Sequence, residues 1–189
     1  MAIKTIHDIS DKTWFITFTC FNWLPLFEIT NSYDLIYNWL NLINDKYAID
    51  TTAFVIMPNH VHVILHLNNL NSLNTIISNG KRFIAYEIIK RLKSQNKNDV
   101  IMKLNLACSN QEKKKGQLHK VFEPSFDTKA ILTNSFLIQK LDYIHHNPVA
   151  GKWNLVDSFN DYEYSSVCFY EKNLDHEKVK IKHYLDLTN

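Results

Sequence analysis

The sequence contains no apolar run that approaches the ~20 residues needed to span a membrane. Its first residues, MAIKTIHDISDKTW, also lack the apolar core of a secretory signal peptide. These two absences predict a soluble, cytoplasmic protein with no membrane partner.

Cysteine is scarce, with three widely separated residues: Cys20, Cys108 and Cys168. No C-x-x-C motif occurs, so the sequence offers neither a disulfide framework nor the spacing of a zinc knuckle. We expect reduced thiols that are buried in the fold.

The chain also has no large excess of positive or negative charge. The formal net charge is +2, from 21 lysines and arginines against 19 acidic residues. Binding to a nucleic acid would therefore depend on local basic patches. Hydrophobic residues make up 46% of the 189 residues, which argues against disorder and suits a chain of about one domain.

Residue patterns predict a mixture of strands and helices. β-Branched and aromatic runs predict strands over residues 13–20, 51–57, 61–67 and 120–126. Apolar residues at helical spacing predict helices over about 33–46, 72–93 and 133–146, and a short one near 165–171. The break at Pro58-Asn59 predicts an antiparallel hairpin between the second and third strands. The polar segment 95–116 is predicted to be a loop or a weak helix.

Two histidines, His60 and His62, lie one residue apart in the otherwise apolar run 54–67. Alternate side chains of a strand share a face and are ~6.6 Å apart along it. Imidazole suits divalent transition metals, and it tolerates Mn2+ or Mg2+ when oxygen ligands complete the shell. The pair is a candidate metal site, with His66 as a candidate third ligand or supporting group. The alternative is a pair of histidines that are hydrogen-bonded at a solvated strand end.

The surroundings of the pair resemble a known family. FVIMPNHVHVIL, residues 54–65, is similar to the HUH block of single-tyrosine transposases, in which U is a bulky hydrophobic residue. LDYIHHNPVAGKW, residues 141–153, resembles the tyrosine block of the REP-associated tyrosine transposase branch, which has a Tyr-Ile-His-x-Asn-Pro-Val pattern. Two shorter segments show a weaker similarity: Trp14-Phe15-Ile16-Thr17 to the family's opening strand, and Tyr164-Ser165-Ser166 to its aromatic-Ser-Ser motif. The four segments occur along the chain in the order expected for the family.

The resemblance implies the HUH endonuclease/transposase fold, an α+β fold of the ferredoxin-like type. Its antiparallel sheet would carry the histidines and have helices packed on one face. Residues 1–189 would form one HUH tyrosine transposase domain, with 157–189 as a C-terminal extension. By matching position, Tyr143 would be the catalytic nucleophile. The ligands of a divalent metal ion, Mg2+ or Mn2+, would be His60, His62 and Asn147.

The implied activity is cleavage and strand transfer of single-stranded DNA, at hairpin or inverted-repeat ends, through a covalent 5′-phosphotyrosine intermediate. Tyr143 and Asn147 are four residues apart and share a helix face. A phenol is a weak nucleophile at pH 7, and a nearby dication can activate it. The resemblance leaves open whether the protein is a monomer or a homodimer that exchanges the tyrosine helix.

Candidate DNA contacts are less specific. The predicted helix 72–93 carries Lys81, Arg82, Lys90 and Arg91, which cannot all share one face. We expect Lys81 and Arg82 to contact phosphates. His146, three residues after Tyr143, is a further candidate DNA contact.

Two other functional classes are compatible with these residues. One is a domesticated relative that binds nucleic-acid hairpins without cutting them. The other is a metal hydrolase with H-x-H ligands and no relation to transposition. The intact His60, His62 and Tyr143 favour the transposase. The lack of a carboxylate motif near the pair argues against the hydrolase.

Overall fold

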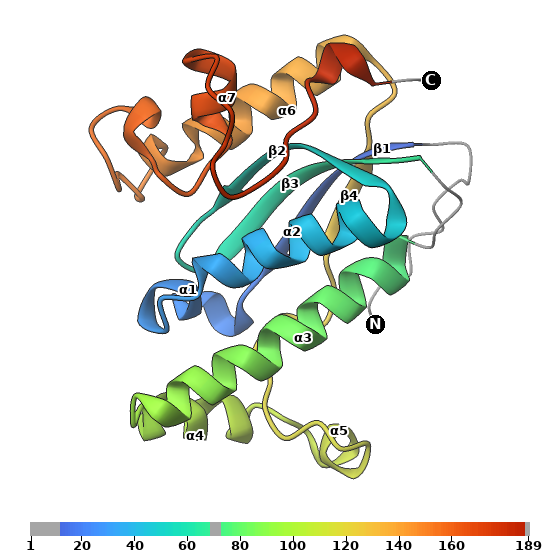
Figure 1. Ribbon diagram of the computed structural model, residues 1–189. Coiled ribbons are helices and arrows are strands. Elements are labelled where there is room, and N and C mark those ends of the chain that lie inside the picture. The colour runs from blue at the N-terminus through green and yellow to red at the C-terminus, as the bar shows by residue number, and fades with distance from the viewer. Residues whose placement is uncertain (1–11, 69–72, 188–189) are drawn as a thin grey trace.

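The computed structural model describes residues 12–68 and 73–187. Four strands form one sheet in the order β2-β3-β1-β4 (Figure 1). They are β1 (Thr13–Thr19), β2 (Ile49–Ile56), β3 (His60–Leu67) and β4 (Asp127–Ala130). All three neighbouring pairs are antiparallel. The predicted α+β class with an antiparallel sheet is confirmed.

Helices cover both faces of this sheet. Helix α2 (Tyr33–Tyr47) packs on one face with α3 (Leu73–Ser94) beside it, and α6 (Asn134–His146) and α7 (Val167–Glu171) lie across the other (Figure 1). The single helical layer implied by the resemblance is thus supplemented by α6, because every residue of β3 is buried and needs cover on both sides. Among the described residues, no helix has the length and apolarity needed to cross a bilayer.

Two apolar cores follow from the alternation of side chains along the strands. Ile16, Phe54 and Val63 point toward α2 and pack with its buried residues. Phe15, Val55 and Ile64 point the other way, where Ile144 of α6 and Tyr162 cover them. His60 and His62 belong to this second face, while Val61 and Val63 are buried on the first, as period-two alternation predicts.

Most predicted elements are confirmed. The hairpin of β2 and β3 and the helices α2, α3, α6 and α7 lie where the patterns place them. The helix predicted over 72–93 is α3, and residue 72, its predicted start, lies outside the described residues. Cys20, Cys108 and Cys168 are unpaired, and the first two are buried.

Two segments differ from the predictions. Residues 95–116 contain two helices, α4 (Asn98–Leu106) and α5 (Asn110–Lys114), and the second begins with a capping box formed by Ser109 and Glu112. The strand predicted at 120–126 is wrong. Only Phe122 makes a bridge there, with Cys20, because its ring turns into the core against Phe18. The edge strand is β4 instead.

The short elements complete the chain. They are η1 (Phe21–Trp23), α1 (Leu26–Ile29), η2 (Asn147–Val149), η3 (Phe159–Asp161) and η4 (Tyr184–Asp186).

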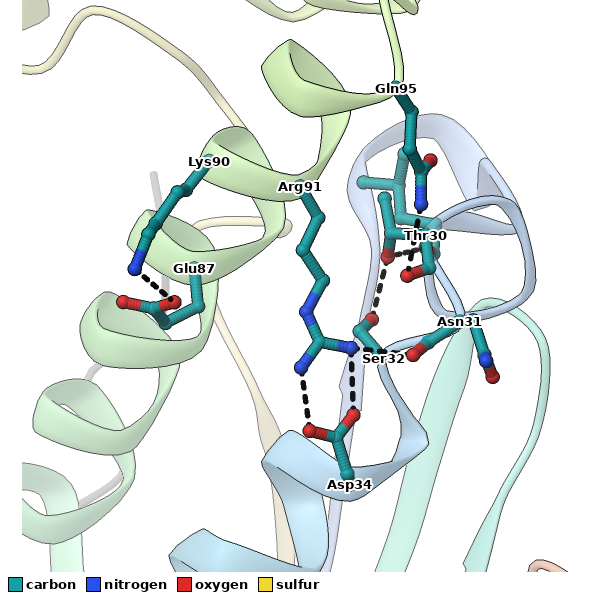
Figure 2. Close-up of polar contacts among 9 residues, drawn as sticks. Thr30, Asn31, Ser32, Asp34, Glu87, Lys90, Arg91 and Gln95 are labelled. Atoms are coloured by element: carbon teal, nitrogen blue, oxygen red, sulfur yellow. Dashed lines mark hydrogen bonds and ion pairs between the residues drawn. The ribbon is translucent and has the colours of Figure 1, made fainter.

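An ion pair joins the two helices of the first face. Arg91 of α3 donates to both carboxylate oxygens of Asp34, at 2.8 and 2.6 Å, and to the carbonyl of Asn31 (Figure 2). Lys90 lies 3.4 Å from Glu87 on the same helix. These cations of α3 therefore already have protein partners.

Candidate active site

The two histidines converge on one point. Their ring centroids are 4.7 Å apart, closer than their spacing along the strand, because the rings lean toward each other. His60 Nδ1 lies 2.7 Å from Asn59 Oδ1, and His62 Nδ1 lies 2.6 Å from Thr17 Oγ1. Thr17 is opposite His62 in the register of β1 and β3. Fixing Nδ1 orients each ring and leaves Nε2 as the atom available to a ligand.

Burial keeps both rings neutral at pH 7. It lowers the pKa of His60 to about 4, against a partly opposing effect of the neighbouring Asn147 side chain. It lowers the pKa of His62 to about 3, aided by repulsion from His60 and Lys140. A neutral imidazole has a free lone pair, which is the form that binds a metal ion.

Asn147 supplies an oxygen to the same place. It follows α6 directly and begins η2, and its side chain is buried. Asn147 Oδ1 and His62 Nε2 are both buried and have no hydrogen-bond partner among the described residues. Such atoms are costly to bury unless something binds them. Two acceptors without partners, next to a second imidazole, fit a divalent cation.

The three candidate metal ligands are an unusual combination of residue types. No group of three His, Cys, Asp or Glu side chains in the described parts of the chain could hold a metal ion. The candidate site has two imidazoles, and the amide oxygen of Asn147 would have to serve as its third ligand. Amide oxygen is a ligand that Mg2+ and Mn2+ accept.

Tyr143 lies at the mouth of this site. Its side chain is 46% exposed, and its ring centroid is 5.1 Å from that of His62. Ile144, the next residue, is fully buried in the second core and anchors α6 against the sheet. One helical turn separates Tyr143 from Asn147, and the first lies against His62 while the side chain of the second adjoins His60. The structure thus brings together the four residues that the resemblance selects.

Lys140 and Phe15 complete the surroundings of the tyrosine. Lys140 Nζ lies 5.3 Å from the centre of the Tyr143 ring and 4.8 Å from that of Phe15. Phe15 stacks on His62 with centroids 5.4 Å apart. Desolvation lowers the pKa of Lys140, as does the cation of Lys129. Lys140 has no acidic partner among the described residues, so it can face an anion.

Sequence reasoning missed four of these neighbours. Asn59 directly precedes His60, and Lys140 is one helical turn before Tyr143, so proximity in sequence could have indicated both. Thr17 and Phe15 are more than forty positions from His62 and become neighbours only through strand pairing.

Three further histidines among the described residues have other partners. His66 Nδ1 lies 2.8 Å from Thr13 Oγ1. His145 is buried, with Nε2 3.0 Å from Ser166 Oγ, which is a structural position. His146 is half-buried and lies 3.0 Å from the carboxylate of Asp142, so a DNA contact there would compete with this pair.

The two predicted phosphate contacts of α3 have different environments. Lys81 donates to the carbonyls of Glu123 and Ser125, at 2.8 and 3.0 Å, and so fastens the segment that precedes β4. Arg82 is exposed, and within the part of the chain that the structure describes its side chain donates only to Asn79 Oδ1, at 3.3 Å. Contact with DNA stays a prediction for both.

Comparison with known proteins gives a structural likeness only. No family model matches the sequence, and no curated protein matches it. A solved structure of a REP-associated tyrosine transposase bound to a REP hairpin matches with a TM-score of 0.58 and 19% identity, over 100% of this chain and 94% of that one. A protein of Deinococcus radiodurans described as a transposase matches with a TM-score of 0.44 and 12% identity, over 76% of this chain and 95% of that one. The first likeness shows that this chain has the fold of a REP-associated tyrosine transposase.

Proposed function

We propose that this chain is a single-tyrosine HUH transposase of the REP-associated branch: a metal-dependent endonuclease and strand transferase acting on single-stranded DNA. One observation carries the proposal. The half-exposed ring of Tyr143 contacts His62, beside two buried acceptors that have no partner among the described residues. A nucleophile and a cation site thus adjoin each other on the fold of such an enzyme.

His60, His62 and Asn147 would hold the ion, Mg2+ or Mn2+. Once bound, it would supply Lewis-acid chemistry at a phosphoryl oxygen. Asn59 and Thr17 keep the two rings aimed at this position through their contacts with Nδ1.

Tyr143 would supply the covalent step. Its phenolic oxygen gives up its proton and attacks the phosphorus of the scissile phosphodiester, and the bond from phosphorus to the 3′ oxygen breaks. The 3′ oxygen takes a proton and leaves as a hydroxyl, while the 5′ phosphate stays on the tyrosine. A 3′-hydroxyl then attacks this phosphotyrosine, and Tyr143 regains its proton. The link conserves the phosphodiester energy, so joining needs no ATP.

Lys140 would support this step electrostatically. Its ammonium lies beside the aromatic ring of Tyr143, where it would offset the negative charge of the phosphate in the transition state. Trp23 and Trp153 flank His60, each with a centroid separation of 5.7 Å, and offer flat surfaces to unpaired bases.

The partner in this proposal is single-stranded DNA that carries a hairpin, with Lys81, Arg82 and His146 as further contacts. The neighbouring structure was solved with a REP hairpin, which supports that choice. We also propose that residues 1–189 act as one domain, with 157–189 as its C-terminal extension, in the cytoplasm.

Labelled hairpins test the proposal. With Mn2+ or Mg2+, a 3′-labelled strand should form an SDS-resistant adduct, because Tyr143 retains the 5′ phosphate of the 3′ fragment. A 5′-labelled strand should only be shortened. Tyr143→Phe should lose the adduct and keep hairpin binding. Tyr47→Phe, at the far end of α2, is the matched control and should retain both.

Two outcomes would contradict it. An adduct formed by Tyr143→Phe would remove Tyr143 as the nucleophile. Hairpin binding by the unaltered protein without any adduct would identify a binding module that does not cleave.

A further inference from the structure

A groove of about 720 Å3 lies away from the candidate active site, between α3 and the loop of residues 115–124. Arg82, Tyr86 and Lys93 line it from α3, and Lys115 and His119 line it from the loop. We call it the α3 groove. Its wall is fastened in place, since Lys81 holds two carbonyls of the segment 123–125 and Lys120 pairs with Glu112 at 3.1 Å.

The charge lining the α3 groove is strongly positive. Lys81, Arg82, Lys93 and Lys115 face it, against a single acid, Glu123. The Glu123 carboxylate already accepts a hydrogen bond from the backbone N–H of Asn22 at 2.8 Å. Arg82, Lys93 and Lys115 have no ion-pair partner in the described ranges 12–68 and 73–187. In a chain of net charge +2, such a concentration indicates an anionic ligand.

The spacing of these side chains indicates an extended ligand. Position 86 follows position 82 by four residues, and position 93 follows position 86 by seven. At these intervals the three side chains lie on one face of α3. At 1.5 Å per residue, Arg82 and Lys93 are separated by ~16 Å along the helix, which is more than one nucleotide requires. Tyr86 lies between them and is 70% exposed. An exposed aromatic ring between two cations suits a base that stacks while its neighbouring phosphates are neutralised.

Other cations of α3 do not take part. Lys90 lies against Glu87, and Arg91 is held by Asp34 (Figure 2). Phe83 is also exposed, at 54%, but does not line the groove. The helix therefore has one face that carries unpaired cations with an aromatic ring, and another whose cations have protein partners.

We infer that the α3 groove binds a short single-stranded stretch of DNA, as a second contact separate from Tyr143, with Tyr86 stacking on a base and Arg82 and Lys93 on phosphates. This assignment rests on the proposed function for the identity of the nucleic acid. The α3 groove would hold the single-stranded DNA next to the hairpin while the candidate active site acts on the scissile bond.

Fluorescence anisotropy tests the groove without chemistry. The probe is a fluorescein-labelled DNA hairpin with single-stranded flanks, titrated without divalent ions at several salt concentrations. Tyr86→Ala should weaken binding by about tenfold or more, and Tyr86→Phe should restore it because the ring remains. Arg82→Ala with Lys93→Ala should reduce the slope of log affinity against log salt by about 1.4, or ~0.7 for each lost contact.

Matched controls lie on the same helix. Phe83→Ala and Lys90→Ala remove an exposed ring and a cation outside the groove, and they should bind the hairpin as the unaltered protein does. Thermal unfolding of each variant confirms that α3 is folded.

The outcomes separate this inference from the proposed function. Unchanged affinity and salt slope in the groove variants would overturn the inference that the α3 groove binds DNA, even if the unaltered protein forms its adduct. Weakened binding in the groove variants, with no adduct from the unaltered protein, would support the groove and reject the enzyme. Failure of the unaltered protein to bind the probe would overturn the groove.

Discussion

Replacing Gly80 with alanine should destabilise the protein, although alanine is the better helix former. Gly80 is a buried residue in the middle of α3. Propensity alone would favour alanine by about 1 kcal/mol. A Cβ at this position, however, would lie 2.4 Å from Nε1 and 2.7 Å from Cε2 of Trp39 on α2.

The indole has little freedom to retreat. Trp39 is 4% exposed and packs edge-on against Phe18, with centroids 5.8 Å apart. Overpacking of this kind costs about 1–3 kcal/mol. Since the clash is severe, we take the upper value and subtract the gain in propensity. Gly80→Ala should then lower the free energy of unfolding by about 2 kcal/mol.

Urea unfolding followed by far-ultraviolet circular dichroism measures this change. The same substitution in a Trp39→Leu background is the control, because leucine lacks the clashing ring atoms. There Gly80→Ala should be neutral or stabilise by up to about 1 kcal/mol. If Gly80→Ala stabilises the unaltered protein as well, α2 and α3 do not pack as closely as described and the reasoning is refuted.

Three further predictions concern the candidate site and its helix. In single-turnover assays, Lys140→Met should slow adduct formation about 10- to 100-fold at unchanged hairpin affinity. Lys140→Arg should restore most of the rate. Equal rates for Lys140→Met and the unaltered protein would show that Lys140 has no part in the chemistry. Mn2+ at about 100 times its dissociation constant should stabilise the protein by about 2.7 kcal/mol in thermal unfolding without DNA, and His62→Ala should abolish the gain. Burial lowers the pKa of His145 to about 4, so the unfolded chain takes up a proton from about pH 6.5 downward while the folded one does not. Stability should therefore fall between pH 6.5 and 4, by at most about 3 kcal/mol from this residue, and His145→Gln should make that part of the profile shallower by this amount, since the buried His60 and His62 contribute over the same range.

Periodicity predicted the elements that carry the site because those elements bury one clear face. Alternation placed His60 and His62 together, and helical spacing placed Tyr143 with Asn147. The edge strand could not be found in this way. Residues 127–130, DTKA, have little strand character of their own and are extended because β1 pairs with them. The apolar segment before them buries Phe122 instead.

The supporting contacts of the site were less accessible to sequence reasoning. The contact between Thr17 and His62 depends on the register of two strands that are 45 positions apart. Lys81 appeared to be a free cation, and only the folded structure shows its ammonium bound to backbone carbonyls. In contrast, the capping box of α5 was present in the sequence as Ser109 and Glu112 and could have been recognised.

His62 meets the ring of Tyr143 within one polypeptide, and this contact has a consequence for genetics. A site that works within one polypeptide predicts that co-expressing two inactive alleles, one without the phenol and the other without an imidazole, does not rescue DNA cleavage. Rescue would show that two copies exchange the helix of residue 143. The yield per molecule should also be insensitive to dilution.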